Sequence, residues 1–151
     1  MSRWCLGASQ EGTDIKIHPI FVDFDDLDAI EAKMRELEAD LARAVERNEL
    51  TLCFQPRVGM KSGGIVSYEA LVRWNHPQHG FMSPAEFIPV AERSRLIIPL
   101  GEWVLREACA HNKALTDVGL GPVKVAVNLS AEQFRTEGLV DMVLSVLKDT
   151  G

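Results

Sequence analysis

The stretch VSYEALVRWNHPQHGF, residues 66–81, places two charged side chains, Glu69 and Arg73, inside a run that otherwise indicates a buried strand. Alternate side chains of a strand point to opposite faces, so Glu69, Leu71 and Arg73 share one face. A charge that is buried without a partner is costly. Glu69 and Arg73 therefore pair with each other or with strand neighbours, or they face an ion or a ligand.

A second strand signal, LTLCFQPRVGM at residues 50–60, comes before this stretch, and the turn KSGG separates the two. The connection is too short for a parallel crossover, so the two strands form an antiparallel hairpin. A turn centred near Ser62 puts Gln55 opposite Glu69 to within one residue. Pro56 has no N–H for the ladder, so we expect a bulge or an unpaired position there.

The chain after the hairpin predicts a parallel βαβ unit. The expected elements are a loop at 75–82, a helix begun by the capping box Ser83–Glu86, a helix at about 100–118 ending at Gly119, a buried strand at 122–130, a second capping box at Ser130–Gln133, and a helix near 139–148. The order of strand, helices, strand and helix is typical of α/β proteins.

Residues 25–48 predict an amphipathic helix, with Asp25 or Asp26 as its N-cap. Its apolar residues recur at spacings of three and four: Leu27, Ile30, Met34, Leu37, Leu41 and Val45. The helix either packs on its own domain or, since the pattern is nearly heptad, forms a dimerising or signal-passing coiled segment. Residues 1–24 are interpreted as a tail or the remnant of a preceding segment.

Composition restricts the class of protein. With 151 residues and 46% hydrophobic content, the chain is long enough for one ordinary core. Residues 23–49 carry ten acidic and four basic side chains, which equals the whole net charge of −6. This charge argues against a nucleic-acid polymer as partner. No apolar run approaches the roughly 18 residues of a membrane span.

Three cysteines are present, at positions 5, 53 and 109. They are odd in number and widely spaced, so they match neither a disulfide framework nor a zinc pattern. We therefore expect a reducing compartment, the cytoplasm.

Polar side chains gather where the expected parallel strands end. Asn128 lies at the C-terminal end of the strand at 122–130, and Glu69 and Arg73 lie late in theirs. In α/β barrels, catalytic residues lie at these strand ends. A carboxylate and an amide oxygen suit Mg²⁺ or Mn²⁺, and a guanidinium suits a phosphate. The pattern favours metal-assisted phosphoester chemistry, although Asn128 equally suits a role as a helix cap.

The two histidines of the loop, His76 and His79, have H-x-x-H spacing. Zinc sites with this kind of spacing are usually helical, and this loop contains Pro and Gly, so we prefer a solvated loop to a zinc site.

Five linked motifs resemble the EAL domain family from about residue 37 to residue 151. They are FQP at 54–56, EALVRW at 69–74, SPAEFIPVAERSRLI at 83–97, LGEWVLREAC at 100–109 and VAVNLSAEQF at 125–134. That family comprises bacterial phosphodiesterases that hydrolyse cyclic di-GMP to pGpG. The resemblance implies an α/β fold, a (β/α)₈ barrel whose first strand is antiparallel, here incomplete and preceded by the amphipathic helix.

The resemblance also implies roles for four residues. Glu69 and Asn128 are expected to bind Mg²⁺ or Mn²⁺, and Gln55 and Arg73 to contact the dinucleotide, Arg73 near a phosphate. The family uses two divalent ions. Its later acidic ligands, a DDFGTG-like segment and a catalytic lysine have no counterpart up to Gly151.

We therefore expect residues 49–151 to be the N-terminal part of a cyclic di-GMP phosphodiesterase domain, inactive as this isolated chain. The alternative is a non-catalytic fragment that binds cyclic di-GMP or another protein. A barrel needs roughly 250 residues, and an unpaired apolar strand edge favours association. A homo-oligomer, or pairing with a full-length EAL protein, is the expected partner state.

Overall fold

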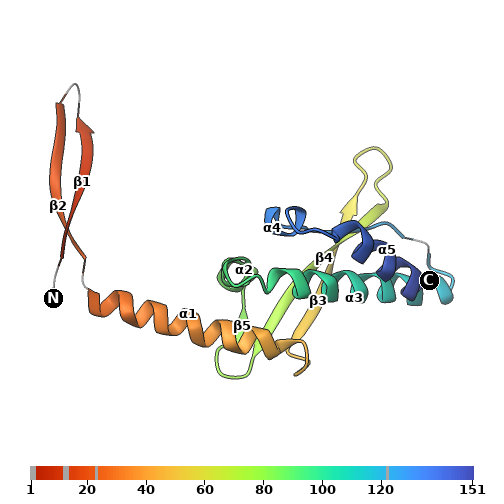
Figure 1. Ribbon diagram of the computed structural model, residues 1–151. Coiled ribbons are helices and arrows are strands. Elements are labelled where there is room, and N and C mark those ends of the chain that lie inside the picture. The colour runs from red at the N-terminus through yellow and green to blue at the C-terminus, as the bar shows by residue number, and fades with distance from the viewer. Residues whose placement is uncertain (1–2, 12–13, 23, 122) are drawn as a thin grey trace. The chain divides into compact units, whose positions relative to one another are not determined.

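The computed structural model places the quoted stretch in β4 (Ile65–His76), the turn that follows it and the start of β5 (Gly80–Met82) (Figure 1). It describes the backbone of residues 3–11, 14–22, 24–121 and 123–151, and the side chains of residues 27–121 and 123–151. The chain divides into two units, Met1–Glu36 and Leu37–Gly151. The second unit contains all the predicted site residues. The side chains of Cys5, Asp25 and Asp26, which the sequence analysis singled out, lie outside the described residues.

The first unit contains a hairpin that the sequence did not predict. Strands β1 (Arg3–Glu11) and β2 (Asp14–Val22) pair antiparallel, with Arg3 opposite Val22. Gly and Pro are poor strand formers, and Gly7 and Pro19 interrupt the two runs. The interpretation of residues 1–24 as a tail or remnant stays a prediction.

Helix α1 (Phe24–Ala44) begins in the first unit and ends in the second. It starts one residue before the predicted cap position. The turn that follows it contains a left-handed residue, Asn48, with φ 54°. The N–H of Glu49 donates to the carbonyl of Ala44 at 3.0 Å, and that of Asn48 donates to Val45 at 3.2 Å. These two bonds form a Schellman motif, which turns the chain sharply into the first strand of the second unit.

The C-terminal part of the apolar stripe on α1 packs into the core of the second unit. Leu41 and Ala44 are buried there, and Leu37 and Val45 pack against them. For this part of the stripe, packing on its own domain is the correct alternative.

The sheet of the second unit confirms the predicted hairpin and the parallel unit. β3 (Leu50–Val58) pairs antiparallel with β4, and β6 (Val125–Val127) pairs parallel with β4. Since β3 occupies one edge of β4 along most of its length, β5 (Gly80–Met82) and β6 share the other edge at different heights. β6 is shorter than predicted, three residues long, and half-buried instead of fully buried.

Pro56 fits the hairpin without a gap in the ladder. It lies opposite Tyr68, and the Tyr68 N–H donates at 2.9 Å to Lys124 on the other side of β4. The Pro56–Tyr68 pair is thus a non-hydrogen-bonded pair, in which an N–H at position 56 would point away from β4. The predicted irregularity does occur, one residue later, between Arg57 and Val58.

The predicted loop at 75–82 is in part wrong. β4 continues to His76, and a turn leads into the short strand β5, with Trp74 opposite Met82. Gly80 has φ +69°, which an L-residue rarely adopts. The turn depends on this glycine, and no alternation over three residues is long enough to reveal a strand.

Helices α2 (Pro84–Arg93) and α3 (Ile97–Asp117) cover one face of the sheet. The predicted capping box is present: the Ala85 N–H donates to Ser83 Oγ, and the Ser83 N–H donates to Glu86 at 2.9 Å. The core between sheet and helices contains Trp74, which is 0% exposed, together with Phe87 and Leu100. The Trp74 and Phe87 rings meet edge to face at 5.5 Å.

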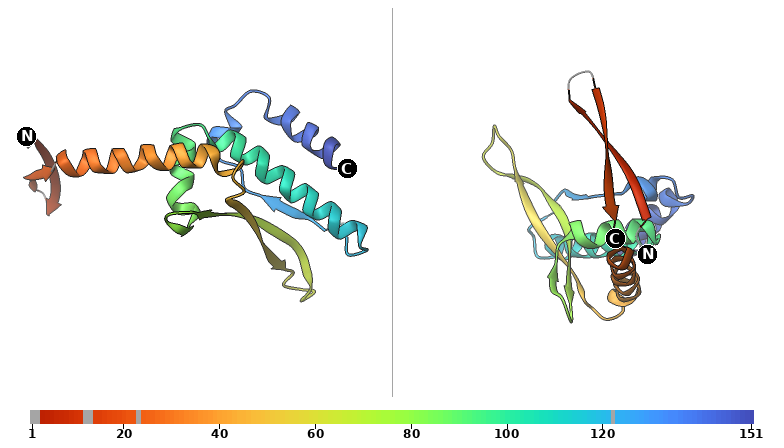
Figure 2. Two further views of the ribbon diagram at one scale, coloured as in Figure 1. Left: turned by 90° about the horizontal axis from the view of Figure 1, so that it is seen from below. Right: turned by 90° about the vertical axis from the view of Figure 1, so that its left-hand side faces the viewer.

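The chain ends in α4 (Ala131–Phe134) and α5 (Leu139–Thr150). α3 lies between the strands and α5 in the left view of Figure 2. Arg106 on α3 donates to Asp149 on α5 at 3.0 Å, and Asp149 and then Glu102 raise the pKa of this guanidinium. The Arg106–Asp149 ion pair connects α5 to α3, whereas the Arg106–Glu102 pair lies within α3.

Candidate functional site

All four predicted site residues lie on one face of the sheet, since Arg73 follows Glu69 on β4 by an even number of residues. Arg73 lies late in β4, as expected, but Glu69 is the fifth of its twelve residues, so the expectation that Glu69 lies late in its strand is wrong. Gln55 on β3 is directly opposite Glu69 on β4, and Glu69 is in register with Ala126 on β6. Residues in register share a face, so Asn128, two residues beyond Ala126, lies on the same face as Glu69. We call Gln55, Glu69, Arg73 and Asn128 the strand-end site.

Glu69 and Asn128 are in direct contact, although 59 residues separate them in the chain. Asn128 Nδ2 donates to Glu69 Oε1 at 2.9 Å. Asn128 is exposed, and it does not cap the following helix, because Ser130 is the N-cap of α4. The alternative that Asn128 caps the following helix is therefore wrong, and Asn128 instead contacts Glu69, the other residue expected to bind a metal.

Arg73 is half-buried, and its Nη1 donates to the carbonyl of Val72 at 2.8 Å. Among the side chains that the structure describes, no ion pair joins Arg73 to Glu69 or to another carboxylate. The alternative that Glu69 and Arg73 form an ion pair with each other is therefore wrong. A guanidinium has five N–H donors, so Arg73 keeps donors for an anion.

The donor set at the strand ends fits a hard divalent cation. Glu69 supplies a carboxylate and Asn128 an amide oxygen, the ligand types that Mg²⁺ and Mn²⁺ prefer. Asn128 turns its nitrogen toward Glu69, so binding a cation requires the amide to rotate by half a turn and present Oδ1. Among residues 27–121 and 123–151, no three His, Cys, Asp or Glu side chains gather in a way that could hold a metal.

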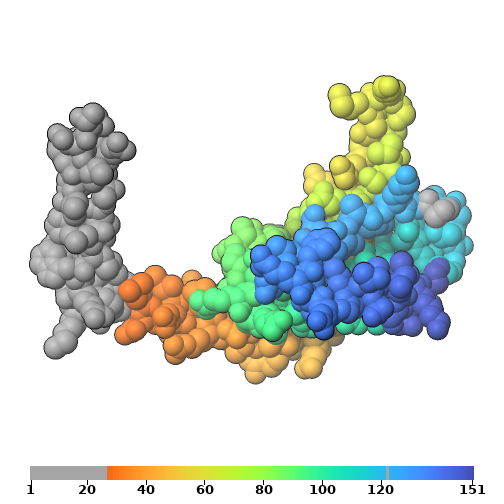
Figure 3. Space-filling view, turned by 45° about the horizontal axis from the view of Figure 1, so that its top comes forward, coloured from red at the N-terminus to blue at the C-terminus, as the bar shows by residue number. Residues whose placement is uncertain are grey.

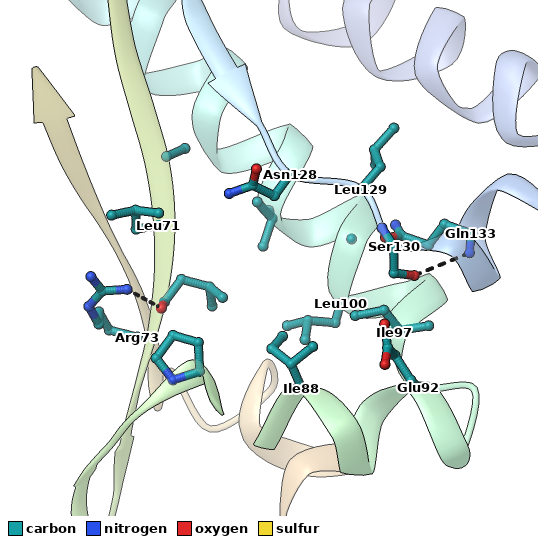
Figure 4. Close-up of a pocket in the computed structure, with 15 residues that line it drawn as sticks. Leu71, Arg73, Ile88, Glu92, Ile97, Leu100, Asn128, Leu129, Ser130 and Gln133 are labelled. Carbon is teal, nitrogen blue, oxygen red and sulfur yellow. Dashed lines mark hydrogen bonds between the residues drawn. The ribbon is translucent and has the colours of Figure 1, made fainter. Parts of the chain in front are cut away.

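A cavity of about 280 Å³ lies next to the strand-end site, on the helix side of the sheet. Figure 4 shows Leu71 and Arg73 on one side of β4, with Ile88 and Leu100 across the cavity on the other. Arg73 and Asn128 contribute to its wall, whereas Gln55 and Glu69 do not. The cavity therefore adjoins the site without containing it.

His76 is not part of a solvated loop, contrary to the prediction, because it is 2% exposed. Its Nδ1 accepts the N–H groups of Gln78 and His79, both at 3.2 Å. These two donors assign the ring proton to Nε2, which donates to Asp40 at 3.3 Å. Both ring nitrogens are used within the fold, so His76 is a structural residue that ties the β4–β5 turn to α1.

The sequence did not reveal that Ser130 and Gln133 line the wall of the cavity beside Asn128. The sequence identified both only as a capping box. One difference between the two capping boxes could have revealed this. The exposed box of α2 has a carboxylate, Glu86, at the third helical position, whereas the box of α4 has a neutral amide, Gln133, at the same position.

Residues 38–151 match the EAL domain family. Since this match covers most of the chain, the protein belongs to the EAL domain family.

Two curated relatives come from Pseudomonas aeruginosa. The bifunctional diguanylate cyclase/cyclic di-GMP phosphodiesterase MucR is 47% identical over 112 residues, which are 74% of this chain and 16% of MucR. A protein named cyclic di-GMP phosphodiesterase is 35% identical over 123 residues, 81% of this chain and 21% of that protein.

Solved structures agree with this family. A MucR phosphodiesterase in complex with cyclic di-GMP is 46% identical, with a TM-score of 0.72, over 76% of this chain and 47% of that one. The FimX EAL domain from P. aeruginosa bound to cyclic di-GMP is 28% identical, with a TM-score of 0.65, over 76% of this chain and 45% of that one. The chain thus spans less than half of these solved domains.

The likeness confirms the predicted fold class, an incomplete α/β EAL fold with an antiparallel first strand and an amphipathic helix before it. That the complete domain of this family is a (β/α)₈ barrel stays a prediction. Among the described residues, no helix is both long enough and apolar enough to span a membrane.

Proposed function

We propose that residues 37–151 supply the metal-binding and phosphate-binding strands of a cyclic di-GMP phosphodiesterase. The observation that supports this most directly is the contact at 2.9 Å between Asn128 and Glu69. It brings a carboxylate in β4 together with an amide just beyond the end of β6, in a family whose relatives carry the name cyclic di-GMP phosphodiesterase.

Each residue of the strand-end site has a distinct role in this proposal. Glu69 and Asn128 hold a Mg²⁺ or Mn²⁺ ion, which when bound acts as a Lewis acid on a phosphoryl oxygen. Arg73 donates to a phosphate through the N–H groups that the Val72 carbonyl leaves unused. Gln55, exposed and opposite Glu69, donates its amide N–H groups to the same ligand.

The second candidate is a cyclic di-GMP-binding function without hydrolysis. The observation in its favour is the likeness to the FimX EAL domain, whose solved structure is bound to cyclic di-GMP. Binding needs Gln55 and Arg73, whereas hydrolysis also needs enough ligands for the ions. Either function fits the cytoplasm, which stays a prediction from the cysteine pattern, and pairing with a second EAL chain also stays a proposal.

The experiment joins residues 37–151 to the C-terminal part of the MucR EAL domain, and we call this protein the joined domain. The joined domain is incubated with cyclic di-GMP and Mn²⁺, and pGpG is followed by chromatography. Metal-dependent pGpG formation is expected. Binding of cyclic di-GMP without pGpG would favour the second candidate, and absence of both would refute the proposal.

The 151-residue chain alone is the matched control. We expect it to form no pGpG, because hydrolysis in this family is expected to need two divalent ions, and the described residues offer Glu69 and Asn128 as ligands. Turnover by the chain alone that disappears in Glu69→Ala and Asn128→Ala variants would contradict this, and would mean that self-association completes the site.

A further inference from the structure

Gln133 is a buried polar residue on a helix that is otherwise largely exposed. It is 3% exposed, whereas its neighbour Phe134 is 68% exposed. The segment around residues 130–140 lies on the surface of the second unit in Figure 3. An apolar residue outside and an amide inside is the reverse of the usual arrangement, so the burial of Gln133 needs a reason.

The two ends of the Gln133 side-chain amide have different surroundings. Oε1 accepts the N–H of Ser130 at 2.9 Å, and the Gln133 N–H donates to Ser130 Oγ at 3.3 Å. Nε2 is buried and has no hydrogen-bond partner among the described residues. It packs against Gly101 of α3 so closely that a Cβ at position 101 would overlap Nε2 and lie 2.9 Å from Cδ of Gln133. Gly101 thus makes room for Gln133.

The same chain contains a matched capping box that lacks this contact. In α2, Glu86 accepts the Ser83 N–H at 2.9 Å, the same distance as in α4, but Glu86 is exposed. A capping box accepts Glu or Gln at this position. The buried box has the neutral amide, since a carboxylate pressed against the backbone of α3 would be an unpaired buried charge.

We propose that Gln133 is a positioning residue that holds Asn128 at the strand end by locking the start of α4 against Gly101. Ser130, which Gln133 clamps, follows Asn128 by two residues, and Asn128 itself is exposed. Asn128 therefore owes its place beside Glu69 to the segments that flank it, the pairing of β6 with β4 on one side and the Ser130–Gln133 capping box on the other. Its importance for catalysis rests on the proposed function, but the lock itself does not.

The test follows the side-chain amide of Asn128 in the full 151-residue chain. The chain has four asparagines, Asn48, Asn75, Asn112 and Asn128, so selective ¹⁵N labelling gives four amide pairs, and Asn128→Asp identifies the relevant one. The Glu69→Ala variant gives the chemical shifts of the Asn128 side-chain amide signals when the contact with Glu69 is lost. Gln133→Ala and Gly101→Ala are expected to move the signals to these chemical shifts.

Two controls separate positioning from a merely structural role. Glu86→Ala removes the other capping box, and Glu132→Ala changes a neighbour on α4; both are expected to leave the Asn128 signals in place. If Gln133→Ala moves these signals no more than the two controls do, the inference is wrong. If Gln133→Ala fails to fold, Gln133→Met replaces it in the test. Methionine fills the space next to Gly101 but cannot accept a hydrogen bond from the Ser130 N–H. Unchanged Asn128 signals in Gln133→Met would overturn the inference.

Mn²⁺ alone distinguishes this inference from the proposed function. If Mn²⁺ broadens the Asn128 signals of the wild-type chain, and Gln133→Ala needs at least a tenfold higher Mn²⁺ concentration for the same broadening, both the inference and the proposed function are supported. If Mn²⁺ leaves the pair sharp while Gln133→Ala still moves it, the metal role of Asn128 fails and the lock stands.

Discussion

Two groups of polar side chains, each with two members on β4, differ in how their hydrogen-bonding capacity is used. The first, which we call the anchor cluster, consists of Asp40, Glu49, Trp74 and His76. The Trp74 indole N–H donates to Glu49 at 3.0 Å, and His76 donates to Asp40 at 3.3 Å. Trp74 and His76 are 0% and 2% exposed, and both ring nitrogens of His76 have partners.

The strand-end site, by contrast, has donors and acceptors left over. Within the described part of the chain, the Glu69 side chain has one hydrogen bond, with Asn128, and the Arg73 side chain has one, with the carbonyl of Val72. Buried polar groups in native proteins are nearly always satisfied, and the anchor cluster follows this rule. The strand-end site has donors and acceptors that a ligand can satisfy. This difference distinguishes residues that stabilise the fold from residues that are available to bind a ligand.

The largest expected effect is on hydrolysis. In the joined domain, Glu69→Ala should lower the rate of pGpG formation by more than about 100-fold. Mutation of a residue that only hydrogen-bonds to a metal ligand typically lowers metal affinity or activity about 10–100-fold, and loss of a ligand itself should cost more. Its far-UV circular dichroism should stay that of the parent. Activity close to that of the parent would show that Glu69 belongs with the residues that only hold the fold.

The anchor cluster should respond in the opposite way. Trp74→Ala is expected to lower the free energy of unfolding by about 3–5 kcal/mol, because it removes a fully buried aromatic side chain. Urea denaturation of the second unit followed by circular dichroism measures this. The control is Trp103→Ala, a half-buried tryptophan at the margin of the same core, and equal losses for the two variants would contradict the distinction.

Arg73 sharpens the comparison because it is partly buried yet belongs to the strand-end site. In the joined domain, Arg73→Ala should raise KM by roughly 10–100-fold, which corresponds to about 1.5–3 kcal/mol for a lost charge-assisted hydrogen bond. The Mn²⁺ dependence should not change. Arg57→Ala is the control: it removes an arginine opposite Ser67, at the other end of the same face, and should change KM much less. If Arg73→Ala instead greatly weakens Mn²⁺ binding, Arg73 orients the metal ligands.

The smallest expected effect belongs to the edge of the anchor cluster. Asp40→Ala should cost about 1–3 kcal/mol of unfolding free energy, because it leaves the buried Nε2–H of His76 without its acceptor. Glu46→Ala, an exposed acidic change close by, should shift the urea midpoint much less. A loss in Asp40→Ala no greater than this control would show that water satisfies His76.

The sequence was most informative where the relevant interactions are local. The hairpin and the pairing of Gln55 with Glu69 follow from a period of two and a short turn. The capping boxes at Ser83 and Ser130 follow from four-residue patterns. Strand β5 could not be predicted, because three residues are too few for a pattern and the turn depends on Gly80.

The contacts among the candidate site residues could not be predicted from the sequence, and their roles stay a prediction. That Asn128 donates to Glu69 depends on a parallel pairing of only three residues on each strand, and spacing along the chain carries no information about it. The burial of His76 and Gln133 was likewise invisible, because each polar side chain is buried by a segment distant in sequence, α1 in one case and α3 in the other.

The register of β4 has a consequence for how this domain evolves. Its buried residues Ala70 and Trp74 face the helices, while Glu69 and Arg73 occupy the alternate face. A mutation that removes Glu69 therefore leaves the core intact. Under the proposed function, a lineage that loses this carboxylate would lose hydrolysis and keep a folded protein, on which selection for ligand sensing or for partner choice would then act.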